Sequence, residues 1–442
     1  MGAGRYKAPM TPAARLSATI DIIGDMDAQR RPAPDVLKEW GLAHRFAGSG
    51  DRAAIAGLTY DSLRRRASSA YVMGEDTPRA VVFGMLRLER GQTADTIAAL
   101  ADGSRFAPSP LTETERARLV AANLAEAPAW IAGDYPQWLD SHLERVFGDE
   151  RAEEGAALAR RAPLDLRVNL LKGERSKALA ELAEYDAQPT RWSPVGIRIT
   201  VPAGAKSPAI QVEPAFIKGL IEVQDEGSQL AALLSGVKPG DIVVDFCAGA
   251  GGKTLALAAM MDKKGEIYAT DTDKRRLAPI HARLERAGVR NVKVLTPRAG
   301  ADATAELAGR ADLVLIDAPC TGTGSWRRNP DAKWRMRPGA LEQRMKEQAE
   351  ILVRAAALVK PGGRIAYVTC SVLDEENGAQ VAHFLARHPE FSLRPPADLA
   401  EPLGERAFLF RKAVLVSDHG LLMTPRRTDT DGFFVAGLQR TA

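Results

Sequence analysis

Residues 241–254, with the sequence DIVVDFCAGAGGKT, pass from a β-branched apolar run into a glycine-rich segment. The apolar run ends on Asp245, and a helix-forming segment, 255–261, follows the glycines directly. A strand, a glycine-rich turn and a helix in this order build a nucleotide pocket at the carboxyl end of the first strand of an open α/β sheet. Glycine lets the backbone approach a ligand, and the helix amino terminus offers unpaired N–H groups. We therefore expect a nucleotide-containing ligand at this loop.

Three kinds of nucleotide site compete for this stretch. A P-loop requires glycine at the position of Cys247, and a dinucleotide fingerprint requires a third glycine where Thr254 stands. S-adenosylmethionine is bound beside the first strand, with an acidic residue at the end of the second strand holding its ribose. Residues 265–271, GEIYATD, supply a turn, a second strand and Asp271 about 20 residues further on. The sequence therefore favours S-adenosylmethionine over the other two ligands and over an ordinary turn without a ligand.

The composition is that of an ordinary globular protein. A chain of 442 residues with 45% hydrophobic and 26% charged residues is long for one domain, so two or three are expected. No apolar run reaches the ~20 residues that a membrane helix needs, and residues 1–7 lack the apolar core of a signal peptide. The sequence therefore predicts a cytoplasmic protein without a membrane partner. The net charge of +4 suits a polyanionic partner without identifying one.

The chain has only three cysteines, Cys247, Cys320 and Cys370, and each follows directly on a strand-like apolar run. So few cysteines exclude a disulfide framework and suit a reducing compartment. No zinc-ligand spacing surrounds them and the chain has only six histidines, so no metal site is expected. A lone cysteine is usually buried and inert, but three at the ends of strands indicate a chemical role.

The hydrophobic pattern divides the chain into three parts. Residues 1–148 are expected to be helical, residues 149–236 to form a small α+β subdomain, and residues 237–442 a doubly wound, mostly parallel α/β sheet. Three arginines, 64–66, end a helix expected at 51–66 and are expected to favour the helix dipole rather than to contact phosphate. Strands of the large sheet, the last of them a hairpin-type edge, are expected at 241–245, 266–270, 292–295, 312–317, 363–369 and 433–438.

Two further stretches carry reactive side chains. The fourth expected strand runs into residues 317–324, DAPCTGTG, and the fifth runs into residues 369–371, TCS. In a doubly wound sheet the first, fourth and fifth of these strands are neighbours, and their carboxyl ends share one crevice. We therefore expect Cys320 and Cys370 to lie close together in space, beside the methyl donor.

Pyrimidine chemistry gives a reason for such a pair of cysteines. Carbon 5 of a pyrimidine is too poor a nucleophile to attack a methyl sulfonium directly. A thiolate that adds to carbon 6 makes carbon 5 enamine-like, so that it can accept the methyl group. A base must then remove the proton from carbon 5 before the thiolate can leave, and covalent catalysis of this kind divides one difficult step into two easier ones. One cysteine is enough for the attack, and a second suits the release.

The motifs CAGAGGKT at 247–254, DAPCTGTG at 317–324 and VTCS at 368–371 together resemble those of the RsmB/Nop/Sun family of RNA cytosine-5 methyltransferases. The resemblance covers roughly residues 160–442 and implies a class I methyltransferase fold, Rossmann-like, with S-adenosylmethionine as cofactor. It also implies that the cysteine of TCS is the nucleophile, that the cysteine of DAPC assists release, and that the aspartate of DAPC orients the cytosine beside the donor. The residues concerned are Cys370, Cys320 and Asp317.

The same resemblance assigns the donor site. It implies that Asp271 holds the ribose, that Asp302 lies near the adenine, and that Asp317 borders the donor. The sequence around Asp302 matches that of the family only loosely. The family usually has Ala-Pro where this chain has Gly249-Ala250, a change that loosens the turn but removes no ligand side chain. The loop expected to bind the donor consists of Cys247, Ala248, Gly249, Ala250, Gly251, Gly252 and Lys253.

Contact with RNA is expected from three regions. Residues 1–145 resemble the NusB-like helical RNA-binding domain of some bacterial members, and Arg167 and Asn169 resemble the Arg-x-Asn of the family's small preceding domain. Residues 325–337 interleave basic residues with two tryptophans, a composition that suits phosphate contact and stacking on an unpaired base better than a solvated loop with core tryptophans. The expected RNA-binding residues of this segment are Trp326, Arg327, Arg328, Lys333 and Trp334.

The function that these features favour is methylation of carbon 5 of a cytosine in RNA, with ribosomal RNA as the expected substrate and a monomer as the expected state. The target base must leave its stack to reach the cysteines. One alternative is a catalytically silent RNA-binding or ribosome-assembly factor, against which the retained cysteines and Asp317 argue. Others are a transfer RNA cytosine-5 methyltransferase and a small-molecule or protein methyltransferase on the same fold. DNA is not expected as substrate, because its cytosine methyltransferases resemble a different motif order.

Overall fold

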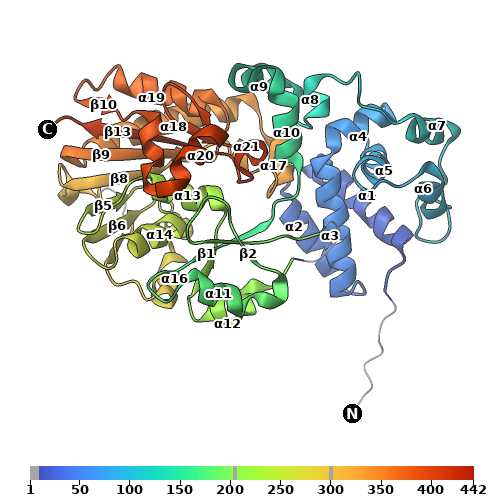
Figure 1. Ribbon diagram of the computed structural model, residues 1–442. Helices are drawn as coiled ribbons and strands as arrows, with labels where there is room; N and C mark the ends of the chain where they lie inside the picture. The colour runs from blue at the N-terminus through green and yellow to red at the C-terminus, as the bar shows by residue number, and fades with distance from the viewer. Residues whose placement is uncertain (1–8, 203–206, 298–301) are drawn as a thin grey trace, which may run out of the picture. The chain divides into compact units, whose positions relative to one another are not determined.

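The computed structural model describes residues 9–202, 207–297 and 302–442. The chain forms two compact units (Figure 1). The first contains the residues up to Arg161 together with the segment Trp326–Met336, and the second contains Ala162–Pro202, Ser207–Ser325 and Arg337–Ala442. None of the helices in the described part of the chain combines the length and the apolar character that a membrane crossing needs.

The first unit is helical. Its first helix begins at Pro12, because the Thr11 hydroxyl accepts a hydrogen bond from the Ala14 N–H and Pro is favoured at the first helical position. Its interior consists of two clusters of apolar side chains, one around Phe83 and one around Ile55. The helices are α1 (Pro12–Gln29), α2 (Ala33–Ala43), α3 (Ser49–Arg64), α4 (Arg66–Met73), α5 (Pro78–Leu88), α6 (Ala94–Leu100), α7 (Glu113–Ala121), α8 (Ala129–Ala132), α9 (Asp140–Phe147), α10 (Arg151–Ala159) and α17 (Pro330–Arg335). The expected boundary at residue 148 falls before α10, which the first unit includes.

The arginines at the end of α3 are occupied by carboxylates of the same unit. Arg64 lies 3.3 Å from its partner, and Arg65 and Arg66 each lie 2.7 Å from one partner. The pairs of Arg65 and Arg66 link neighbouring helices, whereas the pair of Arg64 lies within α3, and all three give these side chains a structural role. The partner carboxylates are Asp61, Glu89 and Asp27.

The segment Trp326–Met336 is part of the interior of the helical unit. The ammonium group of Lys333 donates hydrogen bonds to the backbone carbonyls of Arg64 (3.1 Å) and Asp134 (2.6 Å). The indole N–H of Trp334 donates to the Leu63 carbonyl (2.6 Å). Lys333 and Trp334 therefore satisfy carbonyl groups in the last turn of α3, which an isolated helix would leave without partners.

This placement contradicts the expected RNA contact by Trp326, Arg327 and Lys333. Their exposed fractions are only 1%, 3% and 1%, so they offer no surface on which a base could stack or to which a phosphate could bind. Arg328 and Trp334 are half-buried, and their role in RNA binding stays a prediction. The interleaving of basic and aromatic residues arises because long amphipathic side chains fill and cap a helical interior.

The Lys333→Met variant is expected to lose a pH-dependent part of the free energy of unfolding. Burial lowers the pKa of Lys333 to about 7, whereas a lysine in an unfolded chain has a pKa of about 10.4. Between these values the unfolded chain binds more protons, so the wild-type free energy of unfolding should rise with pH.

Denaturant unfolding at pH 7 and pH 9 should show a gain of about 2 kcal/mol in wild type that the variant lacks. The exposed Lys38 gives the control, since Lys38→Met should retain the gain; equal pH dependence in all three proteins would contradict the prediction.

The second unit begins with a small antiparallel sheet in the order β2-β3-β1-β4. Its strands are β1 (Leu164–Val168), β2 (Gln188–Pro189), β3 (Gly196–Ile199) and β4 (Ile221–Val223), with α11 (Arg175–Glu181) and α12 (Pro214–Ile217) beside them. This sheet with its two helices agrees with the α+β subdomain expected over residues 149–236. An apolar cluster that includes Leu166, Ile197 and Ile221 forms the interior of this subdomain.

Arg167 and Asn169 are internal to the second unit, which contradicts their expected contact with RNA. Their exposed fractions are 3% and 2%. The Asn169 amide donates to the backbone carbonyls of Gly219 (3.0 Å) and Ala287 (2.9 Å), and the Arg167 guanidinium donates to the Gln224 side chain (2.6 Å). The Arg-x-Asn motif therefore joins the small sheet to neighbouring segments, because buried carbonyls and amides need hydrogen-bond partners.

The large sheet has the strand order β11-β12-β13-β9-β8-β5-β6-β7, and β10 also pairs with β13. The strands from β9 to β7 are parallel, whereas β13 runs antiparallel to β9. All six expected strands are present. The strands are β5 (Ile242–Asp245), β6 (Glu266–Thr270), β7 (Val292–Leu295), β8 (Ala311–Asp317), β9 (Val359–Thr369), β10 (Phe391–Leu393), β11 (Leu415–Val416), β12 (Leu421–Met423) and β13 (Phe433–Arg440).

The last expected strand is not at an edge of the sheet. β13 lies between β9 and β12, and six of its eight residues are buried. The short strands β11 and β12, which the sequence pattern does not reveal, form the true edge. The expectation of an edge position for residues 433–438 was therefore wrong. This apolar run has a hydrogen-bonded strand on each side, and its side chains are buried on both faces of the sheet.

Helices pack against the large sheet, whose strands β5, β8 and β9 are neighbours. α18 (Pro338–Ala356) packs against β8 and β9, α14 (Gly252–Met260) against β6, and α13 (Glu226–Leu234) against β13. The remaining helices of this unit are α15 (Lys274–Leu277), α16 (Ile280–Ala287), α19 (Gly378–Leu385), α20 (Ala407–Ala413) and α21 (Pro425–Thr428). Because β5, β8 and β9 are adjacent, the loops that follow them open on the same edge of the sheet.

Candidate active site

The glycine-rich loop lies between β5 and α14, as expected. Gly251 has φ +83°, and a Cβ atom there would lie 2.5 Å from Ile280, so this tight turn requires glycine. At the end of β5, one carboxylate oxygen of Asp245 accepts a hydrogen bond from the Thr254 hydroxyl (2.6 Å). Its other oxygen is buried and has no hydrogen-bond partner among the described residues. Burial raises the pKa of Asp245 to about 7.

Asp271, at the end of β6, fixes the same loop from the neighbouring strand. Its carboxylate accepts hydrogen bonds from the backbone N–H groups of Gly249 (3.0 Å) and Asp273 (2.9 Å). Gly249 has φ +51°, a conformation that a side chain would disfavour. Asp271 is only 4% exposed, and Arg276 approaches it to 3.9 Å. The acidic residue expected on the second strand is therefore held rigidly at the edge of the glycine loop.

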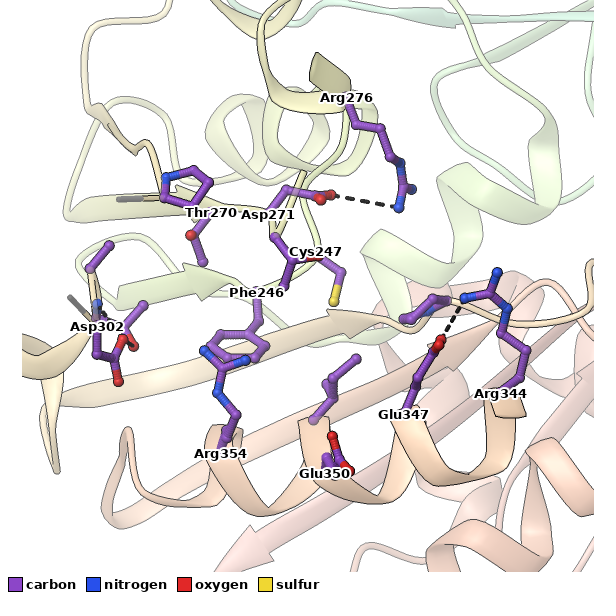
Figure 2. A pocket seen from close by; sticks show the side chains of 16 residues that line it. Phe246, Cys247, Thr270, Asp271, Arg276, Asp302, Arg344, Glu347, Glu350 and Arg354 are labelled. Atoms are coloured by element: carbon purple, nitrogen blue, oxygen red, sulfur yellow. Dashed lines mark hydrogen bonds and ion pairs between the residues drawn. The ribbon is translucent and has the colours of Figure 1, made fainter. Parts of the chain in front are cut away.

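A cavity of about 360 Å³ opens beside this loop (Figure 2). Cys247, Asp271 and Asp302, three of the residues expected at the donor site, line it, while Ala248–Lys253 form the loop alongside. Figure 2 shows α18 along the opposite wall. The guanidinium of Arg354 stands over the ring of Phe246, 5.1 Å from its centroid. The α18 residues that line the cavity are Arg344, Glu347, Glu350, Ile351 and Arg354.

The residues of α18 were missed by the sequence analysis. They belong to a long helix without a glycine motif or a strand end, so nothing in their spacing distinguishes a ligand-facing helix from an ordinary amphipathic one. The only available signal was the position of the helix directly after the DAPC loop.

The cavity has the properties that S-adenosylmethionine requires. Its volume lies in the range of small-molecule sites, which bury most of their ligand. The ring of Phe246 and the side chain of Ile351 offer apolar surface for an adenine, and the carboxylate of Asp271 can accept hydrogen bonds from ribose hydroxyls. The lining also holds both carboxylates and arginines, with Glu347 paired to Arg344, so it offers partners for the sulfonium and for the carboxylate of the donor.

Lys253 does not line the cavity, although it was expected to bind the donor. Its ammonium group donates to a carboxylate oxygen of Asp317 at 2.7 Å, and its side chain is 7% exposed. The Asp317 side chain is 34% exposed at the end of β8. Lys253 therefore neutralises and orients the aspartate of the DAPC loop, which keeps an accessible carboxylate oxygen.

The two cysteines expected to be neighbours are in contact. The sulfur atoms of Cys320, in the loop after β8, and Cys370, after β9, are 3.3 Å apart, which confirms the expected proximity. The hydrogen bond to Cys370, together with burial, raises the pKa of the Cys320 thiol well above its usual value. Cys320 therefore keeps its proton and can donate it toward the Cys370 sulfur. Burial also raises the pKa of Cys247, the third cysteine, at the donor cavity.

Backbone contacts lock the two cysteine loops together. The Gly324 N–H donates to the Cys370 carbonyl (2.9 Å), and the Val372 N–H donates to the Thr323 hydroxyl (2.8 Å). The Gly432 N–H, ahead of β13, donates to the Gly324 carbonyl (2.8 Å). A Cβ atom on Gly324 would lie 2.2 Å from the Gly432 carbonyl oxygen, so only glycine permits this approach. The separation of the sulfur atoms is thus fixed by three chain segments.

A doubly wound sheet with a glycine-rich loop and an acidic second strand around such a cavity defines an S-adenosylmethionine-dependent methyltransferase. A family model described as 16S rRNA methyltransferase RsmB/F matches residues 232–439, and a model of the ferredoxin-like domain of RsmF/B-like methyltransferases matches residues 135–205. The chain belongs to the RsmB/F family, since it is also 32% identical to the probable ribosomal RNA small subunit methyltransferase B of Synechocystis sp. over 94% of this chain and 97% of that protein.

Other relatives agree with this assignment. The ribosomal RNA small subunit methyltransferase B of Sodalis glossinidius is 34% identical over 68% of this chain and 65% of its own length. Among solved structures, that of PH0851 matches with a TM-score of 0.70 and 28% identity, and covers 98% of this chain and 100% of that chain. The resemblance therefore extends over both units.

Proposed function

We propose that this protein transfers the methyl group of S-adenosylmethionine to carbon 5 of a cytosine in ribosomal RNA. The observation that carries the proposal is the pair of sulfur atoms, Cys320 and Cys370, 3.3 Å apart at the edge of the sheet that carries the donor cavity. Two thiols at this spacing match a reaction on two adjacent carbon atoms, in which one sulfur bonds to carbon 6 and the other serves carbon 5.

In the proposed reaction the thiolate of Cys370 adds to carbon 6, which makes carbon 5 nucleophilic. S-adenosylmethionine, when bound, supplies the methyl group that carbon 5 accepts. Once the Cys370 sulfur is bonded to carbon 6, its hydrogen bond no longer holds the Cys320 proton. Cys320 then gives that proton to solvent, and its thiolate takes the proton from carbon 5. The electrons of that C–H bond restore the double bond between carbons 5 and 6, and the carbon–sulfur bond breaks, which returns Cys370 as a thiolate.

Asp317 is suited to hold the cytosine. Lys253 occupies one of its carboxylate oxygens, and the side chain is partly exposed. We propose that the free oxygen accepts a hydrogen bond from the exocyclic amine of the base, a contact that carboxylates make with cytosine. The base must be extruded from its stack to reach this position.

The names of the relatives favour ribosomal RNA as substrate. The relative from Sodalis glossinidius is named ribosomal RNA small subunit methyltransferase B, and that from Synechocystis sp. is named as a probable one. We therefore propose the RNA of the small ribosomal subunit for this chain. We further propose that the helical unit, like a NusB-like domain, assists RNA binding. A catalytically silent assembly factor is disfavoured because such a protein has no need for two sulfur atoms in contact.

The proposal is tested with RNA that carries tritium on carbon 5 of its cytidines. Wild-type protein and unlabelled S-adenosylmethionine should release one tritium to water for each methyl group gained, and digestion should yield 5-methylcytidine. Separate reactions with small-subunit ribosomal RNA, the isolated small subunit and transfer RNA identify the substrate. Methyl transfer without tritium release would place the methyl group on another atom and overturn the chemistry. No transfer to any of the three substrates would favour the silent factor.

A further inference from the structure

Two side chains outside the motifs at 247–254, 317–324 and 368–371 form hydrogen bonds with the Cys320 loop on both sides of the cysteine. On one side, the Gln348 amide of α18 donates a hydrogen bond to the Pro319 carbonyl (3.0 Å). On the other, the Glu376 carboxylate accepts hydrogen bonds from the Thr321 backbone N–H (2.8 Å) and from the Thr321 hydroxyl. The Gln348 amide also donates a hydrogen bond to the Glu376 carboxylate (3.0 Å), which links the two side chains. The residues before and after Cys320 are thus held by one connected pair.

One member of the pair, Glu376, belongs to the segment that carries the other cysteine. Glu376 follows Cys370 by six residues, and its backbone carbonyl accepts a hydrogen bond from the Tyr367 hydroxyl of β9 (2.7 Å). Its neighbour Asn377 donates from its side-chain amide to the Ser371 carbonyl (2.9 Å). Glu376 is therefore fixed to the strand and loop of Cys370 while its carboxylate holds the loop of Cys320.

Burial of these two polar side chains lowers the stability of the folded protein unless their hydrogen bonds compensate for it. Glu376 and Gln348 are both 0% exposed, and a buried carboxylate lowers the stability of a protein unless donors surround it. The hydrogen-bond partners of the carboxylate are Thr321, Gln348 and the Ser371 side chain, so its bonds join the Cys320 loop to α18 and to the residue that follows Cys370. Neither residue lines the donor cavity. The Gln348 side chain touches the lining of that cavity through Pro319, whose carbonyl accepts its hydrogen bond.

We propose that Glu376 and Gln348 are positioning residues that hold Cys320 in register with Cys370 and thereby set the rate at which the product is released. The inference rests on the proposed function, in which the Cys320 sulfur must reach the carbon 5 proton while carbon 6 is bonded to Cys370. A shift of about 1 Å in a reacting group lowers a rate by about 100-fold. Attack by Cys370 needs no such register and is expected to be less affected.

The test compares Gln348→Leu and Glu376→Gln with wild type in two assays. In the first, a single-turnover reaction measures methyl transfer, and multiple turnover and denaturing gels measure release and the covalent RNA adduct. Each variant should transfer the first methyl group at a rate within a few-fold of wild type, turn over 10- to 100-fold more slowly, and accumulate the adduct. The exposed Gln188 provides a matched control, Gln188→Leu, which should behave as wild type. Equal losses in the first transfer and in turnover, without adduct, would reduce the pair to a structural role and overturn the inference.

The second assay needs no RNA and separates the two proposals. Diamide, which accepts two electrons and two protons, should join the wild-type sulfur atoms of Cys320 and Cys370 in a disulfide, which peptide mass spectrometry identifies. The variants should form this disulfide at least about tenfold more slowly, with thermal unfolding close to that of wild type. If they do so but neither the variants nor Cys320→Ala forms an RNA adduct, the positioning role stands and the cysteine mechanism falls. Disulfide formation at the wild-type rate in both variants would overturn the positioning role.

Discussion

Cys370→Ala is expected to reduce methyl transfer to RNA by about 10⁴-fold or more, because the attacking thiolate is lost and no other group lies in its place. The sulfur of Cys320 is 3.3 Å away; the variant removes its bond to Cys370, but burial remains and still raises the pKa of its thiol. It is therefore a poor substitute nucleophile. The measurement is transfer of labelled methyl groups to RNA in single-turnover reactions, with the covalent protein–RNA band read on the same denaturing gel.

Cys320→Ala should behave differently from Cys370→Ala although the two sulfur atoms touch. Its Cys370 can still attack, so the first methyl group is transferred, but the base for the carbon 5 proton is absent. A stable protein–RNA adduct should therefore accumulate. The pair of variants is its own control, since both remove one sulfur atom from the same contact. If Cys370→Ala methylates RNA as well as wild type, the assignment of the nucleophile is wrong.

Asp271→Ala is expected to weaken binding of S-adenosylmethionine by about 100-fold or more. The substitution removes the carboxylate proposed for the ribose hydroxyls and also releases the Gly249 N–H, so the loop loses its fixed conformation. Hydrogen bonds to a charged group contribute about 1.5–3 kcal/mol each, and two of them account for this loss. Calorimetric titration with S-adenosylmethionine measures the affinity, and thermal unfolding of the apoprotein shows whether the variant folds.

A neighbouring aspartate gives the control for this prediction. Asp273 lies two residues away, does not line the cavity and uses its carboxylate to cap α15. Asp273→Ala should therefore bind S-adenosylmethionine to within a few-fold of wild type. Equal affinity of Asp271→Ala and wild type would mean that the donor binds elsewhere than in the cavity beside β5 and β6.

Much of the catalytic sheet could be predicted because its signals are local. The β-branched run before Asp245, the glycines after it and the acidic residue ending the next strand all lie within about 30 residues, the span of one βαβ unit. All six expected strands of the large sheet are present. The contact between Cys320 and Cys370 followed from topology alone, since parallel strands that are neighbours place their carboxyl ends together.

Predictions based on side-chain type alone were less successful. Trp326, Arg327 and Lys333 have the composition of an RNA-binding loop, and Arg167 and Asn169 that of a substrate motif, yet all five are buried. An arginine or a lysine serves phosphate and a buried backbone carbonyl with the same N–H groups. The sequence does not record which of the two partners is near, because this depends on residues that are far away in the chain.

The sequence by itself thus determined the parallel sheet, the methyl-donor loop and the two reactive cysteines. These depend on periodicity and on motifs whose residues are contiguous. The tertiary structure alone decided the internal position of β13, the wall that α18 gives to the donor cavity, and the grip of Gln348 and Glu376 on the Cys320 loop. Each of these is a contact between segments distant in sequence, and such contacts are chosen by how the whole chain buries its apolar surface and satisfies its buried polar groups.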